Sequence, residues 1–240
     1  MKNYFQKSTS AAPLAVFRVA FGMLLFASII RFWLKGWIHE LYIEPKYFFP
    51  FFGFEFISSP GEYIYVVFAI CGLSAFLVAI GFFYRVTSVV LFLTFTFIEL
   101  VDKSTYLNHY YFVSMTCLIM IFLPAHVYFS VDAYRNRSLA FDKVPQWSVD
   151  FIKLFVFLIY FFAGLAKINS DWLLNAQPLR IWLPSKNDLP FIGWLFNYVW
   201  VAYVFSWLGC LYDLSIPFLL LKRSTRTFAY AGVVIFHLLP

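Results

Sequence analysis

The chain has 240 residues, of which 62% are hydrophobic, 24% aromatic and 12% charged. Because soluble globular proteins carry about a quarter charged residues, this composition excludes an ordinary soluble domain. The formal net charge of +6 comes from basic residues scattered over short polar segments, which argues against nucleic-acid binding and for contact with anionic membrane lipid.

Apolar runs recur along the chain and predict an all-α fold, a polytopic bundle of transmembrane helices. A bilayer core about 30 Å thick needs about 20 residues of helix. The predicted spans are about 13–34, 63–83, 86–101, 107–124, 151–166 and 195–221, with a seventh from about 227. Pro217 predicts that the sixth is tilted or broken there. We interpret 1–240 as one transmembrane domain of about seven spans. We also expect the chain to be truncated, because "VVIFHLLP" ends it inside an apolar run.

The basic residues predict an orientation with the N-terminus in the cytoplasm. With that orientation, residues 35–62 and 167–193 face the outside and 125–150 the cytoplasm. The inner segments then hold nine basic residues: Lys2, Lys7, Arg85, Arg135, Arg137, Lys143, Lys222, Arg223 and Arg226. The outer loops hold six: Lys35, Lys46, Lys103, Lys167, Arg180 and Lys186. We expect Arg18 and Arg31, near opposite ends of the first span, to reach the interface or to pair with loop acids.

The first outer loop contains "ELYIEPKYFFPFFGFEFISSPG", which is dense in aromatic residues and interrupted by prolines. Aromatic rings with a polar edge favour the boundary between membrane and water. The loop is therefore predicted to lie on the outer membrane face. Two interpretations stay open at this point: it covers a site there, or it is only an aromatic anchor.

Polar residues gather near the outer ends of the third, fourth and fifth spans, in "ELVDKSTYLNHYY" and "YFFAGLAKINSDW". Lys167 shares a helix face with Tyr160, Ala163 and Gly164, and the two small residues leave space for a helix or a flat ligand. Lys167 is then either an interfacial anchor or a desolvated amine that works as a base, since lost hydration favours the neutral form. His109 either bonds a neighbouring helix or faces Lys167 across the bundle.

The remaining ionisable residues give weaker signals. We expect Asp213 to make a structural bond to an arginine or a backbone amide, and His126 to be structural. His237 lies near mid-membrane, where an ionisable group usually marks a cavity or pathway. The three cysteines lie within apolar runs, and the four histidines are dispersed, so neither a disulfide framework nor a metal site is predicted. No HExxH, CxxC, GxSxG or Gly-rich phosphate loop is present.

Three blocks of the sequence resemble the vitamin K-dependent gamma-carboxylase family, which belongs to the wider HTTM group of membrane proteins. They are "VDKSTYLNHYYFVSMTCLIMIFLPAHVYFSVDAY", "VPQWSVDFIKLFVFLIYFFAGLAKINSDWL" and "WLGCLYDLSIPFLLL". The resemblance extends over nearly the whole chain, and "LNHYY" and "YFFAGLAKINSDW" are its most specific parts.

The resemblance implies a mechanism. In that family a lysine amine deprotonates vitamin K hydroquinone, and the anion reacts with dioxygen to give a strong base that becomes the epoxide. This base removes a γ-proton from a glutamate of a protein substrate, and the carbanion adds carbon dioxide. Lys167 falls on the family's lysine, and His109 on the histidine associated with completing carboxylation. Tyr160 and Asn108 match neighbouring family positions.

Two departures from the family accompany the resemblance. Ala166 stands where the vertebrate carboxylase has a second lysine next to the catalytic one. The family also continues into further spans and an extracytoplasmic region that helps to hold the protein substrate.

The prediction is therefore a membrane enzyme that uses vitamin K hydroquinone or a related quinol, with dioxygen and carbon dioxide as co-substrates and its active face extracytoplasmic. Lys167 and His109 are the predicted catalytic residues, and the predicted cofactor-binding residues are Tyr160, Asn108, Gly164 and Ala163. Possible partners are membrane lipid, the quinol and a glutamate-containing protein substrate. The alternatives are a non-catalytic HTTM protein with a transport or peptide-toxin immunity role and, less favoured, a quinone-binding electron-transfer subunit.

Overall fold

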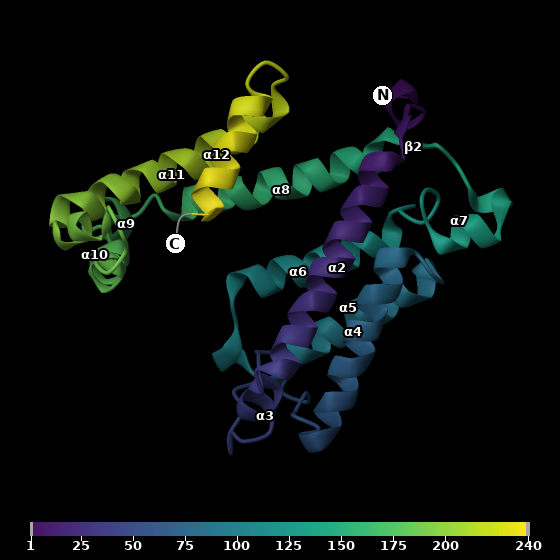
Figure 1. Ribbon diagram of the computed structural model, residues 1–240, viewed down its shortest axis with the longest axis horizontal. Coiled ribbons are helices and arrows are strands. Elements are labelled where there is room, and N and C mark those ends of the chain that lie inside the picture. The colour runs from purple at the N-terminus through teal and green to yellow at the C-terminus, as the bar shows by residue number, and fades with distance from the viewer. Residues whose placement is uncertain (1, 239–240) are drawn as a thin grey trace. The chain divides into compact units, whose positions relative to one another are not determined.

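The computed structural model describes residues 2–238, and helices dominate it (Figure 1). The helices are α1 (Lys2–Phe5), α2 (Ala12–Leu34), α3 (Trp37–Tyr42), α4 (Ile64–Ile80), α5 (Tyr84–Val101), α6 (Asn108–Phe122), α7 (Val131–Arg135), α8 (Gln146–Ala166), α9 (Ser170–Leu173), α10 (Leu179–Trp182), α11 (Val199–Leu221) and α12 (Arg226–Leu238). Short 3-10 helices are η1 (Gly61–Tyr63), η2 (Lys103–Thr105), η3 (Arg137–Leu139), η4 (Leu183–Lys186) and η5 (Gly193–Asn197). The predicted all-α fold is confirmed.

Apolar helices of membrane-spanning length account for most of the predicted spans. Within residues 2–238, five helical segments are long and apolar enough to cross a bilayer: Ala12–Leu34, Gly61–Ile80, Tyr84–Val101, Gln146–Ala166 and Val199–Leu221. The apolar helices α6 and α12 are shorter, with 15 and 13 residues. The chain is thus an integral membrane protein.

The chain forms two compact units, Met1–Val149 and Asp150–Pro240, with the boundary inside α8. In the first unit, α2 packs against α4, α4 against α5, and α5 against α6. Gly22 permits the closest approach, because a Cβ there would lie 2.7 Å from the Ala75 carbonyl oxygen and 2.8 Å from the Ala79 Cβ. Small residues at such crossings let membrane helices approach closely.

The sequence specifies where the helices of the first unit begin and end. Pro13 occupies the first turn of α2, where its missing N–H costs nothing. Gly81 ends α4 with a φ of +68°, a conformation that glycine adopts without strain. The Asp132 carboxylate accepts hydrogen bonds from the backbone amides of Phe83 and Tyr84, both at 2.9 Å, and so caps the start of α5.

A short antiparallel ladder joins the N-terminal segment to the segment before α8. Strand β1 (Ser8–Ser10) pairs with β2 (Lys143–Pro145), with Thr9 opposite Val144. The Gln146 backbone amide extends the ladder by donating to the Lys7 carbonyl oxygen at 2.9 Å. Three-residue strands carry too few residues for a periodic pattern, so sequence reasoning missed this pairing.

The second unit is built around α11. A small core of buried residues lies where α10, η4 and η5 meet the start of α11, and it contains Ala176, Leu183, Phe196, Val201 and Ala202. The helix α12 packs against the other end of α11. Because α11 continues through Pro217 as one helix, the span is not broken there, and the alternative, a tilt, stays a prediction.

Candidate functional site

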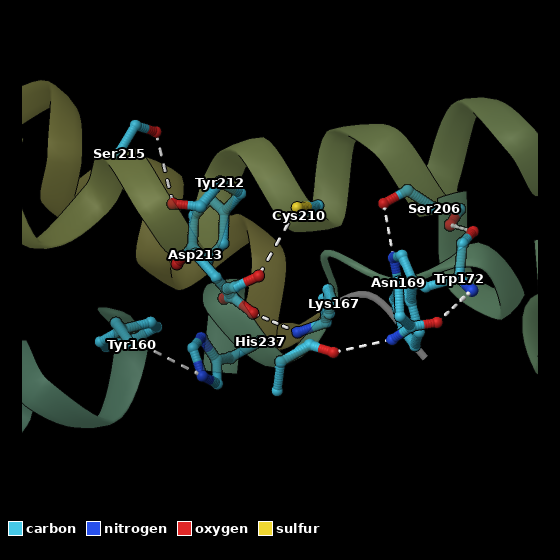
Figure 2. Close-up of polar contacts among 12 residues, drawn as sticks. Tyr160, Lys167, Asn169, Trp172, Ser206, Cys210, Tyr212, Asp213, Ser215 and His237 are labelled. Carbon is cyan, nitrogen blue, oxygen red and sulfur yellow. Dashed lines mark hydrogen bonds and ion pairs between the residues drawn. The ribbon is translucent and has the colours of Figure 1, made fainter. Parts of the chain in front are cut away.

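Lys167 directly follows α8, at the point where the chain leaves the helix (Figure 2). Asn169 ends the helix there: its side-chain amide donates to the Ala166 carbonyl oxygen at 2.8 Å. Its side-chain oxygen accepts from the Trp172 amide at 2.9 Å, which caps α9. Short polar side chains favour such caps over continued helix. These two hydrogen bonds fix the backbone conformation after α8, and with it the position of the Lys167 Cα.

The Lys167 ammonium donates to the Asp213 carboxylate of α11 and forms an ion pair with it (Figure 2). The side chain of Lys167 is 21% exposed and that of Asp213 6%, so water screens the pair only weakly. The expectation that Asp213 bonds an arginine or a backbone amide is wrong. Pro217 follows four residues later and has no N–H, so it leaves the Asp213 carbonyl without its usual helical donor.

Trp172 forms one wall of the site. Its ring centroid lies 5.1 Å from the Lys167 Nζ, within the range of a cation–π interaction. The indole N–H donates to the Ser206 carbonyl oxygen at 2.8 Å, and the Ser206 hydroxyl donates back to the Trp172 carbonyl oxygen. These two bonds tie α9 to α11 and hold the indole beside the ammonium.

Gly164 is where α8 and α11 touch. A Cβ at this glycine would lie 2.7 Å from the Leu214 Cγ and 2.9 Å from the Leu214 backbone nitrogen. The Cys210 thiol approaches the Gly164 carbonyl oxygen at 3.6 Å. The sequence allowed either a helix or a flat ligand beside Gly164, and the structure shows that α11 fills this space. Ala163 is only half-buried.

A second group of polar side chains lies on α8, α11 and α12. The Tyr160 hydroxyl is 3.5 Å from His237 Nε2, and the His237 Nδ1 is 2.9 Å from the Val233 carbonyl oxygen. Because a carbonyl only accepts, Nδ1 carries the proton in the neutral ring and the Tyr160 hydroxyl donates to Nε2. The Tyr212 ring meets Tyr160 edge-on, with centroids 6.1 Å apart. Tyr160, Tyr212 and His237 thus form a cluster beside Asp213 (Figure 2).

His109 and Asn108 belong to the first unit and open α6. Both side chains are exposed, and the His109 ring meets Tyr110 edge-on at 4.6 Å between centroids. Lys167 belongs to the second unit. The shared cavity for His109 and Lys167 therefore stays a prediction.

The aromatic loop between α3 and η1 is anchored by the segment between α5 and α6. The Asp102 carboxylate accepts from the Phe49 amide at 3.1 Å, and the Lys103 amide donates to the Phe49 carbonyl oxygen at 2.7 Å. At the start of the loop, burial raises the pKa of the Tyr42 hydroxyl, and the nearby Glu99 carboxylate acts in the same direction. The loop thus contacts the segment that leads to His109, and its two interpretations, a cover and an aromatic anchor, both stay predictions.

Comparison with known protein families identifies the family of the chain. A family model described as the HTTM domain matches residues 6–240. The chain belongs to the HTTM family. The match includes both compact units and every residue of the site just described. No solved structure matches the chain.

Of the Lys167–Asp213 pair in this HTTM domain, sequence reasoning identified Lys167 as a site residue but did not identify Asp213 as its partner. Asp213 carried a usable signal, because a carboxylate in an apolar span needs a cationic partner. His237 was recognised only by its depth, and its contact with Tyr160 depends on how α12 folds back along α11. Tyr212 carried no signal, since tyrosines are abundant in this chain.

The HTTM domain offers no cluster of metal ligands in its described part: no group of three or more His, Cys, Asp or Glu side chains among residues 2–238 could hold a metal ion. The side chains at the site carry an amine, a carboxylate, phenols and an imidazole. These groups exchange protons and form hydrogen bonds.

Proposed function

We propose that this HTTM protein is a quinol-oxidising membrane enzyme in which Lys167 is the base and Asp213 holds it in position. The observation that carries the proposal is the hydrogen-bonded Lys167–Asp213 pair between the end of α8 and the middle of α11. Ionisable side chains within transmembrane segments are costly and usually functional.

The pair gives Lys167 a route to its neutral form. Moving one proton along the hydrogen bond converts ammonium and carboxylate into a neutral amine and a carboxylic acid. The Asp213 side chain is only 6% exposed, so this proton would pass directly between the two groups with little contact with water. The neutral amine can then accept a proton from a weakly acidic hydroxyl group without any proton passing to bulk water.

The surrounding side chains suit a flat aromatic head group such as that of vitamin K hydroquinone. Trp172, Tyr160 and Tyr212 contribute rings, and His237 adds an imidazole. Lys167 and Asp213 would hold the quinol hydroxyl by hydrogen bonds. When bound, a hydroquinone of this kind supplies, with dioxygen, the driving force for removing a glutamate γ-proton and adding carbon dioxide. A bound quinol packed against these rings would limit the access of water, which would quench a strong base.

A non-catalytic role for the same HTTM domain is the competing function. The observation in its favour is that Lys167 and Asp213 satisfy each other and that Trp172 covers the ammonium. An ion pair that only stabilises the packing of α8 against α11 would have the same geometry. The two functions differ in what arginine does at position 167, because guanidinium keeps the charge and the ion pair but does not deprotonate.

The test is epoxide formation from vitamin K hydroquinone under oxygen, with full-length protein in lipid membranes. We expect Lys167→Arg and Lys167→Ala each to lower the rate by about 100-fold or more, the contribution of a general base. The matched control is Lys153→Arg, on the same helix, where the lysine is 55% exposed and pairs with Asp150 at 2.9 Å. This variant should keep the wild-type rate.

Two further measurements distinguish a catalytic base at Lys167 from a purely structural ion pair. A small primary amine added to the medium should partly restore the Lys167→Ala rate, because it fills the vacated space, and should not restore Lys167→Arg. Asp213→Asn should lower the rate while the protein stays folded, because an amide still accepts a hydrogen bond from Lys167 but takes no proton. Wild-type epoxide formation by Lys167→Arg would overturn the base role.

A further inference from the structure

Arg18 is the largest fully buried side chain of the first unit, 0% exposed, although it lies in the transmembrane helix α2. The expectation that it reaches the interface or pairs with a loop acid is wrong. Its Nη2 donates to the Phe129 carbonyl oxygen, whereas Nε and Nη1 are buried without a hydrogen-bond partner within residues 2–238. Gly81 leaves room for the guanidinium, since a Cβ there would lie 2.1 Å from Nη1.

The buried guanidinium also has no counter-charge in ion-pair range among the described residues. Asp132 interacts with it electrostatically, but its two carboxylate oxygens accept hydrogen bonds from the amides of Phe83 and Tyr84. An unpaired buried charge is expensive, and native proteins pair such charges or bind an ion to them. Arg18 therefore needs an anion that the described chain does not provide.

A cavity of about 730 Å³ lies against Arg18, between the first half of α2, the end of α4 and the segment that contains α7. Arg137 and Asp142 are the other charged side chains of its wall, so with Arg18 the charged groups sum to one positive charge. Arg137 lies over the Tyr134 ring at 5.6 Å. The volume falls within the range of about 300–1,000 Å³ that is typical of small-ligand sites.

A smaller apolar groove of about 250 Å³ adjoins this cavity along the start of α2. It shares Val19, Tyr128 and Phe129 with the cavity wall, and its remaining lining is Ala12, Ala15, Val16 and Ala20. A cationic cavity next to a groove without charges matches a molecule with an anionic head and a hydrocarbon chain.

We propose that this cavity is a binding site for an anionic phospholipid, with the phosphate of the head group facing Arg18 and Arg137 and one acyl chain in the groove lined by Val19 and Val16. The proposal does not depend on the proposed enzymatic function, because every residue that carries it belongs to the first unit. The bound phosphate supplies a negative charge beside the buried Arg18 guanidinium and the Arg137 side chain.

The test compares lipids on the full-length protein in an uncharged detergent. Phosphatidylglycerol and phosphatidylcholine with the same acyl chains are titrated, and bound lipid is counted by native mass spectrometry. We expect phosphatidylglycerol to bind at least about tenfold more tightly, and Arg18→Gln to remove that preference, since a hydrogen-bonded charge contributes about one to two powers of ten. Lys7→Gln removes an exposed positive charge from the same unit and should keep the preference.

A second variant guards against misfolding of Arg18→Gln. Val19→Phe narrows both the cavity and the groove without touching the guanidinium, and should weaken phosphatidylglycerol binding at least about tenfold, because it displaces the acyl chain. Equal binding of the two lipids, or equal loss in Lys7→Gln and Arg18→Gln, would overturn the site. Inorganic phosphate that displaces the lipid at equal concentration would show a free-anion site and contradict the lipid assignment.

Discussion

Gly164 allows a sharp test of how α8 and α11 hold the Lys167–Asp213 pair. A Cβ at this position would lie 2.9 Å from the Leu214 backbone nitrogen, which cannot move unless α11 moves. Lys167 lies three residues after Gly164, and Asp213 is the neighbour of Leu214. Gly164→Ala should therefore push the two helices apart at the ion pair.

The expected magnitude follows from two opposing terms. Overpacking a close contact costs about 1–3 kcal/mol. Alanine in place of glycine inside a helix stabilises the folded state by about 1 kcal/mol. Gly164→Ala should thus lower the free energy of unfolding by about 0–2 kcal/mol. At Gly209 on α11 the nearest atom to a new Cβ is the Trp172 Cζ2 at 4.0 Å, so Gly209→Ala keeps only the favourable term of about 1 kcal/mol.

The assay is unfolding of both variants in mixed detergent micelles, followed by tryptophan fluorescence, beside epoxide formation. Gly209→Ala should be more stable than Gly164→Ala by about 1–3 kcal/mol. Only Gly164→Ala should lose activity, because only it displaces Lys167 from Asp213. If Gly164→Ala proves at least as stable and as active as Gly209→Ala, the close approach of α8 and α11 at Gly164 is refuted.

Three further predictions concern the first unit. Gly81→Ala should destabilise the protein by more than about 2 kcal/mol, because it strains a backbone with φ +68° and its Cβ meets the Arg18 guanidinium at 2.1 Å; thermal unfolding measures this. Burial, with the positive charge of Arg85, lowers the pKa of His126, so the folded state favours the neutral ring. Stability should therefore be complete above about pH 6.5 and fall as the pH drops below it, and His126→Gln should reduce this dependence. Cysteines placed at Ser58 and Ser138 should react with an impermeant reagent in intact cells only at position 58, as the basic-residue count predicts.

The controls for these predictions come from the same chain. Gly36 has a similar φ of +72° but open space around a new Cβ, so Gly36→Ala should cost less than the change at Gly81. Equal losses would show that the guanidinium contact contributes nothing. A pH dependence unchanged in His126→Gln would assign it to other groups. Labelling only at position 138 would reverse the predicted orientation.

The apolar segments were predictable because their signal is local. Hydropathy adds up along the chain, and the bilayer thickness sets the length that a span needs. The segments predicted at 13–34 and 151–166 correspond to α2 and α8, within a few residues at the start of α8. Lys167 was predictable for the same reason, since a basic residue that ends an apolar run stands out from its neighbours in sequence.

The partners of these residues were decided by the tertiary structure alone. Lys167 and Asp213 are 46 residues apart, and the contact between them depends on how α8 and α11 rotate about their axes. Arg18 has the same residue type as the surface arginine Arg31, and only the packing of Gly81 and Phe129 around it makes it buried. Composition and periodicity therefore determined that this protein spans a membrane, because those properties belong to single segments. The pairing of its charges was decided by packing between distant segments, because the cost of a buried charge depends on what surrounds it in space.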